Sequence, residues 1–375
     1  MTTVAAPVIE PHKVELVLRQ LDGLPPLPSI VTRMLSCSDD SDDRGEDIVG
    51  LIEGDASLSA RLIALARRSG PAWGPAPNAF AEAVARLGVH AVREAALCIK
   101  VMEVFGPSPE PREDGGLDRS EFWKYCIGVA CAAGRIASQS SSSLSPDAAF
   151  RWGLLHDLGV VALDRVMPKS LARIIQQSRD TSQDAHDVAQ SLLGVDHNVV
   201  GRRLATRWEL PQSIIECIWL HDQDPEGLPP SVAAGGHVQI VQLASALVRE
   251  LRIGDWLPRA ERSAQNLSAQ SLSVQDLAGR MGLDSPALDE IGKWVCDEVE
   301  HRARMLGLDD RGRGERPSRT VSHEADSLTR ANSTLAEQNR LLARKAGYFN
   351  GLSFLGRSIS PGDSVIGACG AAAEA

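Results

Sequence analysis

The stretch RWGLLHDLGVVALDRVMP, residues 151–168, decides the fold class of this chain. Its apolar residues recur at three- and four-residue steps, which is the period of an α-helix that buries one face. We therefore predict a buried helix over 146–166, with the adjacent polar pair His156 and Asp157 inside it. Because unpaired polar groups are costly in apolar surroundings, this pair must have partners. It is the first candidate for chemistry in the sequence.

The same helical period continues through nearly every segment up to residue 308. Strict alternation with β-branched and aromatic residues never lasts long enough to predict a sheet. We therefore predict an all-α fold. Further helices are expected at 11–21, 28–37, 45–54, 57–68, 78–87, 89–105, 119–139, 169–178, 184–193, 196–208, 211–221 and 231–252.

The composition argues against a nucleic-acid partner. The chain has 39 Lys and Arg against 49 Asp and Glu, and only 7 Trp, 2 Tyr and 6 Phe. Nucleic-acid surfaces need a basic field and often aromatic stacking. No run reaches the roughly 20 apolar residues that cross a bilayer, and the N-terminus lacks the features of a signal peptide. We expect a cytoplasmic protein with no membrane partner.

The seven cysteines are scattered, without a C-x-x-C pair, and their total is odd. This spacing fits neither a disulfide framework nor a zinc site. We predict reduced cysteines that act as small core residues. They are Cys37, Cys98, Cys126, Cys131, Cys217, Cys296 and Cys369.

Ordered blocks of sequence between residues 14 and 225 resemble the HDOD family, the HD-related output domain. The blocks are LDGLPPLPSIVTRML (21–35), LIEGDASLSARLIALARRSG (51–70), AFAEAVARLGVHAVREAAL (79–97), EFWKYCIGVACAAGRIA (121–137), AFRWGLLHDLG (149–159), LLGVDHNVVGRRLATRWELP (192–211) and IIECIWLH (214–221). The resemblance implies a body like that of HD-type metal phosphohydrolases, in which the metal ligands have decayed. It also implies a regulatory role in bacterial signalling.

In HD phosphohydrolases the His-Asp doublet binds a divalent metal together with an upstream His and a distant Asp. The resemblance places Tyr125 at the upstream position and Ser245 at the distant one. A neutral phenol and a neutral hydroxyl are poor replacements for an imidazole and a carboxylate. We therefore expect a degenerate site with no catalytic residue, no bound metal and no cofactor.

Four potential ligands remain, and they are weak candidates for a single metal: His156, Asp157, His197 and His221. The alternative is a hydrogen-bonded polar group in the core. In that case His156 donates to a carbonyl or carboxylate on a facing helix. Asp157 would accept from the backbone, Arg151 or Arg203.

Two neighbouring polar residues also have ordinary structural explanations. Asp196, which precedes His197, is predicted to cap helix 196–208. His221 is expected at a helix end, where a partly positive ring is favoured by the helix dipole.

Beyond residue 225 the organisation changes. Residues 226–308 are expected to form a helical extension of the body, and the sequence leaves open whether 257–308 is a separate unit. Residues 309–320 are predicted to be a linker, because charge, Gly and Pro replace the apolar pattern. Residues 350–375 are similar to the opening helices of a GAF domain, so they are the possible start of a downstream sensor domain.

Residues 321–349 show a seven-residue repeat of apolar positions, and we predict a parallel dimeric coiled coil. Asn at two a positions fits this reading, because a buried Asn pairs best with its own copy. The alternative is an amphipathic helix packed on its own body. The predicted dimer interface consists of Leu328, Asn332, Leu335, Asn339 and Leu342.

Three functions remain open. The first is a non-catalytic regulatory module that forms a homodimer and binds other signalling proteins or a downstream sensor or kinase-type domain. The second is an HD-type metal-dependent phosphohydrolase acting on a nucleotide or cyclic dinucleotide. The third is a nucleotide-sensing domain that does not hydrolyse its ligand. We favour the first, because Tyr125 and Ser245 stand at ligand positions.

Overall fold

All regular secondary structure in the described part of the chain is helical, which confirms the all-α prediction. The structure is a computed structural model, and it describes residues 11–36, 43–68, 77–106, 116–140, 143–181, 183–254, 256 and 273–308. The predicted linker, the coiled coil with its five interface residues, and segment 350–375 lie outside the described residues. None of the described helices is both long and apolar enough to cross a bilayer.

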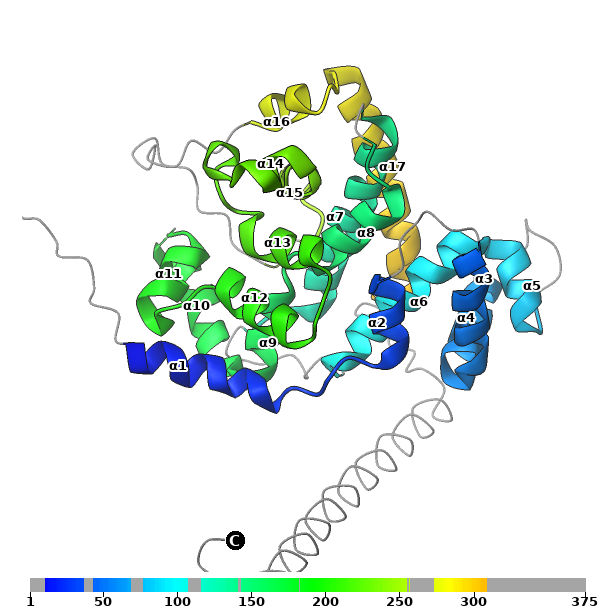
Figure 1. The fold of residues 1–375 in the computed structure, drawn as a ribbon, viewed down its shortest axis with the longest axis horizontal. Helices are drawn as coiled ribbons and strands as arrows, with labels where there is room; N and C mark the ends of the chain where they lie inside the picture. The colour runs from blue at the N-terminus through cyan, green and yellow to red at the C-terminus, as the bar shows by residue number, and fades with distance from the viewer. Residues whose placement is uncertain are drawn as a thin grey trace, which may run out of the picture. The chain divides into compact units, whose positions relative to one another are not determined.

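Figure 1 shows the arrangement of the helices, which are numbered in chain order. The first six are α1 (Pro11–Gln20), α2 (Ser29–Ser36), α3 (Asp43–Gly54), α4 (Ala56–Arg68), α5 (Phe80–Leu87) and α6 (Val89–Val104). The next seven are α7 (Arg119–Gln139), α8 (Pro146–Leu155), α9 (Leu158–Val166), α10 (Pro168–Thr181), α11 (Ala185–Leu193), α12 (His197–Arg207) and α13 (Gln212–Leu220). The last four are α14 (Pro230–Gly235), α15 (His237–Glu250), α16 (Val274–Arg280) and α17 (Ser285–Leu306).

Helix α7 is the central element of the core. The Asp118 side chain caps its first turn by accepting hydrogen bonds from the backbone N–H groups of Ser120 and Glu121. Most of its residues are buried, because α8, α15 and α17 all pack against it. A helix that is covered on several sides is apolar around most of its circumference, as this one is.

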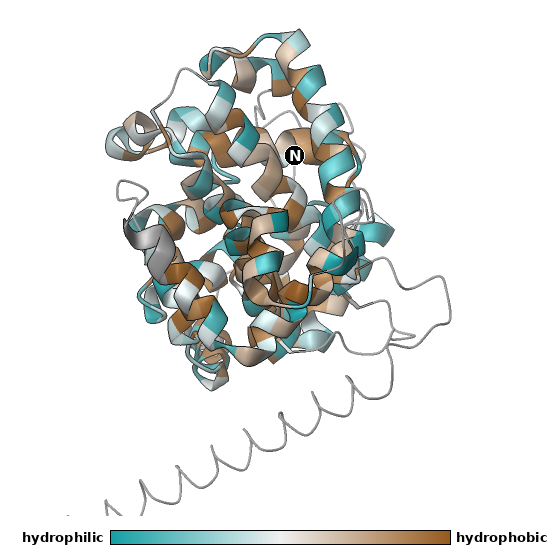
Figure 2. Cartoon of the chain, turned by 90° about the vertical axis from the view of Figure 1, so that its right-hand side faces the viewer, coloured by the Kyte–Doolittle hydropathy of each residue, from teal (hydrophilic) through white to brown (hydrophobic). Residues whose placement is uncertain are grey.

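The helices that follow residue 225 belong to the same body. The described residues up to 308 lie in one compact unit, and α15 and α17 share a hydrophobic core with α7. Figure 2 shows hydrophobic and hydrophilic residues alternating along individual helices, as expected for helices that bury one face.

The predicted single helix over 146–166 is wrong, because the structure breaks it at the His-Asp pair. Helix α8 ends at Leu155 and α9 begins at Leu158, so His156 and Asp157 lie in the turn between them. The backbone of Asp157 leaves the helical region, with φ −99° and ψ 26°. The turn directs both side chains toward neighbouring helices. Likewise, the predicted helix 231–252 is interrupted at Gly236, where φ is +70°.

Helices α9 and α12 approach each other unusually closely at two glycines. A Cβ atom on Gly159 would lie 1.8 Å from the carbonyl oxygen of His197, and one on Gly201 would lie 3.0 Å from the backbone nitrogen of Gly159. Asp196 caps α12 by accepting from the Val199 N–H, as predicted from the sequence. This contact brings the first residue of α12 against the turn that carries Asp157.

The cysteine prediction is correct for four residues and wrong for one. Cys98, Cys126, Cys131 and Cys217 are free and buried, whereas Cys296 is free and exposed on α17. The exposed thiol lies on the outer face of an amphipathic helix, where the apolar pattern does not require burial. Cys37 and Cys369 lie outside the described residues.

Candidate functional site

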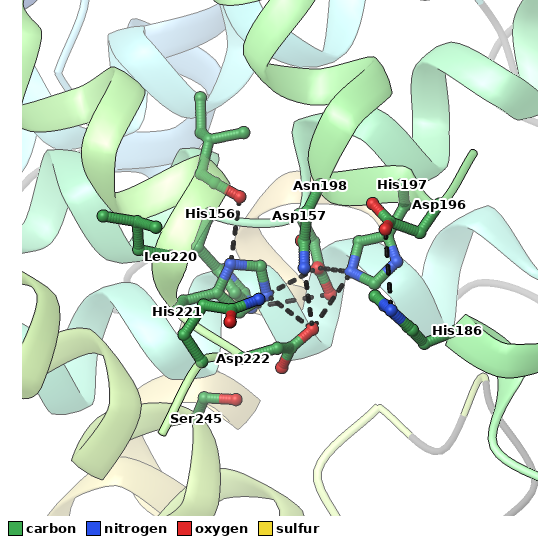
Figure 3. Close-up of polar contacts among 12 residues, drawn as sticks. His156, Asp157, His186, Asp196, His197, Asn198, Leu220, His221, Asp222 and Ser245 are labelled. Atoms are coloured by element: carbon green, nitrogen blue, oxygen red, sulfur yellow. Dashed lines mark hydrogen bonds and ion pairs between the residues drawn. The ribbon is translucent and has the colours of Figure 1, made fainter. Parts of the chain in front are cut away.

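The site is centred on the buried carboxylate of Asp157, which faces three imidazole rings (Figure 3). One oxygen, Oδ1, lies 3.3 Å from Nε2 of His197 and 3.3 Å from Nε2 of His221. The other, Oδ2, lies 3.5 Å from Nε2 of His156. The structure therefore brings together all four predicted weak candidates. The observed neighbours of Asp157 are imidazole rings. The sequence had predicted that Asp157 accepts from the backbone, Arg151 or Arg203.

A second carboxylate, Asp222, completes this arrangement and was missed by the sequence analysis. Its Oδ2 atom lies 3.3 Å from Nε2 of His197 and 3.4 Å from Nε2 of His221. The side-chain amide of Asn198 donates to the same oxygen at 3.4 Å. A signal was present in the sequence, because His221 and Asp222 form a further His-Asp doublet, after those at 156–157 and 186–187.

Backbone carbonyls fix the orientation of two of the rings. Nδ1 of His156 lies 2.8 Å from the carbonyl oxygen of Gly153, and Nδ1 of His221 lies 3.1 Å from that of Cys217. A carbonyl oxygen only accepts, so each Nδ1 carries the proton. In a neutral ring the lone pair is then on Nε2, which is the atom that faces Asp157.

In this geometry, hydrogen-bond acceptor atoms face one another. Asp157 Oδ1 and His221 Nε2 are both buried, and neither has a hydrogen-bond partner within the described part of the chain. A carboxylate oxygen 3.3 Å from an imidazole lone pair is favourable only when a proton or a metal cation lies between them. The site therefore needs a positive charge.

The pKa shifts show how protons can supply that charge. Burial acts to lower the pKa of His197, but the adjacent carboxylates of Asp157 and Asp222 outweigh it and raise the pKa to about 10. Burial also acts to lower the pKa of His221, which the charges of Asp222 and Asp157 raise. For His156 burial prevails over the charge of Asp157, and its pKa falls to about 4.

The pKa values of the two carboxylates are lowered, opposite to the change for His197 and His221. Burial acts to raise their pKa values, but the neighbouring imidazoles hold the pKa of Asp157 and of Asp222 well below the usual range. The carboxylates are therefore charged, and in the absence of a metal the imidazolium of His197 balances part of their charge.

Tyr125 and Ser245, the two substituted ligand positions, meet beside His156. The Tyr125 hydroxyl lies 2.8 Å from Oγ of Ser245 and 3.4 Å from Nε2 of His156. Burial raises the pKa of Tyr125 above its ordinary value, so the phenol stays neutral. Its single proton can go to His156 while Ser245 donates to its oxygen. In this arrangement the potential metal-binding nitrogen of His156 is already occupied.

Arg249, from α15, contributes a permanent positive charge next to both parts of the site. Its Nε donates to the Tyr125 hydroxyl at 3.1 Å, and its Nη2 lies 3.6 Å from Oδ1 of Asp222. The sequence alone did not predict a role for Arg249 in the site. It lies one helical turn after Ser245, so both side chains project from the same face of α15.

The donor atoms fit one metal ion. Within the described ranges two groups have ligand atoms within 4.8 Å of one another: His156, Asp157 and His221, and His197, His221 and Asp222. Nitrogen and carboxylate donors suit a borderline divalent cation. The unpartnered Asp157 Oδ1 and His221 Nε2 favour such an ion. Tyr125 and Ser245 do not fit a second one, because both are neutral and bonded to each other.

Comparison with known proteins identifies the class to which this fold and site belong. The sequence profile of the HDOD domain matches residues 24–224. The chain belongs to the HDOD family, as the resemblance in its sequence predicted. An uncharacterized protein of Treponema pallidum is 25% identical over 206 residues, which are 55% of this chain and 39% of that protein. The chain thus spans well under half the length of this curated relative.

Solved structures support the same fold. An HDOD domain protein of unknown function from Geobacter sulfurreducens is 27% identical, with a TM-score of 0.61, and the match covers 79% of this chain and 99% of that chain. A candidate signal transduction protein from Marinobacter aquaeolei is 20% identical, with a TM-score of 0.60 and coverage of 79% and 65%. A candidate phosphohydrolase from Shewanella amazonensis is 21% identical, with a TM-score of 0.55 and coverage of 78% and 97%.

Proposed function

We propose that this HDOD protein is a non-catalytic regulatory module that binds other signalling proteins and relays conformational change through a dimeric coil. The observation that carries the proposal is the closed hydrogen-bond network of Tyr125, Ser245 and His156. It occupies the side of the site where a two-metal enzyme needs charged ligands. Two-metal hydrolysis depends on a pair of cations roughly 3.5–4 Å apart.

The packing around the network gives the relay a physical path. Tyr125 belongs to α7, whereas Ser245 and Arg249 belong to α15, and α17 also packs on α7. A ligand or partner that favours one packing of α7 against α15 shifts the equilibrium between two conformations of the body. Helix α17 is the last described helix, and the chain then continues toward the predicted coil.

The second candidate is metal-dependent phosphohydrolysis of a nucleotide or cyclic dinucleotide. It is favoured by the unpartnered atoms of Asp157 and His221. Asp157, His197, His221 and Asp222 would hold a single cation. When bound, such a cation acts as a Lewis acid and lowers the pKa of a bound water. The relative from Shewanella amazonensis described as a candidate phosphohydrolase is consistent with this alternative.

Metal analysis and turnover of the full chain distinguish the two candidates. The purified protein is loaded with Mn²⁺ or Zn²⁺ and dialysed, its metal content is measured, and hydrolysis of bis(p-nitrophenyl) phosphate and of cyclic dinucleotides is followed. The regulatory proposal expects no turnover above that of Asp157→Ala. Turnover that Asp157→Ala abolishes would establish the enzyme. Saturable nucleotide binding without hydrolysis would instead indicate a sensing domain.

A double variant sharpens this test. Tyr125→His with Ser245→Asp restores an imidazole and a carboxylate at the substituted positions, and we expect it to bind more metal per chain than the wild type. Ser138→Ala, on the exposed part of α7, is the matched control and should leave the metal content unchanged. An unchanged metal content in a folded double variant would show that the two substitutions do not limit binding.

The proposed dimer is tested separately, by sedimentation. Leu335→Ala with Leu342→Ala should convert a dimer to a monomer while the helical body remains folded. The control replaces Glu337 and Arg344, at outward positions of the same repeat, with Ala. A dimer that survives the first double variant would place the association elsewhere. Asn332→Leu should raise the stability of the coil and loosen its choice of oligomer.

A further inference from the structure

A pocket of about 210 Å³ lies between α17 and helices α4, α5 and α6. None of these four helices supplies a side chain to the site around Asp157. The pocket is lined by one residue of α4, two of α5, three of α6 and five of the last turns of α17. Its position is therefore independent of the candidate metal site.

The lining is mainly apolar. Leu65, Leu87, Ala91, Ala95 and Leu306 contribute hydrocarbon surface, and Met305 contributes a thioether. The small side chains of Ala91 and Ala95 on α6 leave room that larger residues would fill. For scale, an engineered apolar cavity of about 150 Å³ in another protein binds benzene. A volume of about 210 Å³ therefore suits a molecule with about nine non-hydrogen atoms.

The charged groups of the pocket offset one another. Arg302 is held between two carboxylates, with Nη2 2.6 Å from Glu94 and Nε 2.6 Å from Glu298. Arg86 adds a second guanidinium to the lining. Glu94 lies outside the lining but is ion-paired to Arg302, so the two arginines and the two glutamates together leave no net formal charge. An ionic ligand would lose its hydration without gaining a compensating charge, so an uncharged ligand is favoured.

The nature of the lining also favours an aromatic ligand over an aliphatic one. Guanidinium groups and thioethers both make favourable contacts with aromatic rings. Arg302 already shows this preference, because its guanidinium lies 5.2 Å from the centre of the Phe150 ring. Glu298 and His301 offer hydrogen-bonding atoms to a polar group on the ring system.

From these observations we infer that the pocket between α17 and α4–α6 binds a small uncharged aromatic molecule. Such a ligand would contact the last turns of α17 on one side and α5 and α6 on the other. It would therefore stabilise the packing of α17 on these helices. The binding does not depend on the regulatory function proposed above, and only a role as a signal input rests on that function.

The test is calorimetric titration of the full chain with two probes of similar size, indole and benzoate. Each has about nine non-hydrogen atoms, but only benzoate is charged at pH 7. We expect one saturable site for indole with a Kd of about 0.1–1 mM. Benzoate should bind at least about tenfold more weakly. Absence of saturation by indole, or equal or tighter binding of benzoate, would overturn the proposal.

Variants locate the binding in this pocket. Ala91→Leu fills the space and should weaken indole binding at least about tenfold. Ala81→Leu, an exposed position on α5 outside the lining, adds the same volume and should leave binding unchanged. If Ala91→Leu does not fold, Met305→Gln replaces it, because an amide in an apolar lining should also weaken binding. Unchanged indole binding in the folded variant would place the ligand elsewhere.

Discussion

The two sides of the site at His156 and Asp157 differ in whether their polar atoms are satisfied. On one side the hydroxyls of Tyr125 and Ser245 bond to each other, and no atom of either is left without a partner. On the other side Asp157 Oδ1 and His221 Nε2 lack a hydrogen-bond partner in the described structure. The comparison shows that a buried polar site can be closed by neutral residues on one side and still require a positive charge, from a proton or a metal ion, on the other.

The largest effect on stability is expected from removing Asp157, the central carboxylate of the side that lacks hydrogen-bond partners. Asp157→Ala leaves the half-buried imidazolium of His197 and the buried ring of His221 without one of their two carboxylates. Loss of one partner from a buried charged group costs about 3–5 kcal/mol, so we expect a decrease of that size in the free energy of unfolding. Urea denaturation followed by circular dichroism measures it.

Asp289→Ala is the control for this prediction. Asp289 is exposed on α17, and its removal should change the free energy of unfolding by less than about 0.5 kcal/mol. A cost below about 1 kcal/mol for Asp157→Ala would mean that its charge is already screened by solvent, contrary to the burial of Asp157 and His221.

The next effect tests the helix contact that holds His197 near Asp157. In Gly159→Ala the new methyl group would overlap the carbonyl oxygen of His197, so α9 and α12 must separate. We expect a destabilisation of about 1–3 kcal/mol, measured by thermal unfolding. Gly279→Ala on α16 has nothing within 4 Å of the added atom and should be neutral or slightly stabilising.

The pH dependence of stability comes from His197, whose pKa is raised from 6.5 to about 10. A group that binds its proton more tightly in the folded state stabilises that state fully below its unfolded pKa. The free energy of unfolding should therefore fall as the pH rises from 6.5 toward 10. Urea titrations in the presence of a chelator measure this slope.

His197→Gln should remove most of the slope, because glutamine does not titrate. His90→Gln, at an exposed position on α6, should leave it in place. An equal slope in wild type and His197→Gln would show that the proton balancing Asp157 and Asp222 resides on another group.

The smallest effect on stability is expected on the side of the site formed by Tyr125 and Ser245. Tyr125→Phe removes one hydroxyl and leaves Ser245, Arg249 and His156 without that partner. A lost hydrogen bond of this kind costs about 1–2 kcal/mol in the free energy of unfolding. Tyr348→Phe, at the other tyrosine of the chain, is the control. If Tyr125→Phe costs as much as Asp157→Ala, the two sides do not differ as described.

Much of the fold was predictable because its signals are local. Helical periodicity placed α7 at 119–139, and the Asp before His197 correctly indicated the cap of α12. The break at His156 was not predictable from periodicity, because the apolar pattern runs through the turn without interruption. The turn instead accompanies tertiary contacts, namely those that His156 and Asp157 make with α7, with α12 and with the residue that follows α13.

The site was predictable in part. The residues of the first doublet, with His197 and His221, were found from blocks of sequence that match a family pattern. Asp222 and Arg249 were missed because their roles depend on how α13 and α15 pack together, which spacing along the chain does not reveal. For Asp222, the available signal was the His-Asp doublet at 221–222.

The burial of α7 sets a practical limit on how short a fragment of this protein can be. The family profile ends at residue 224, but the helices that cover one flank of α7 are α15 and α17, which end at Glu250 and Leu306. A recombinant piece stopped at residue 224 would present that flank, rich in alanine and β-branched residues, to solvent and invite aggregation. A fragment that contains the whole helical body should end after Leu308, because the side chain of Leu308 is also buried.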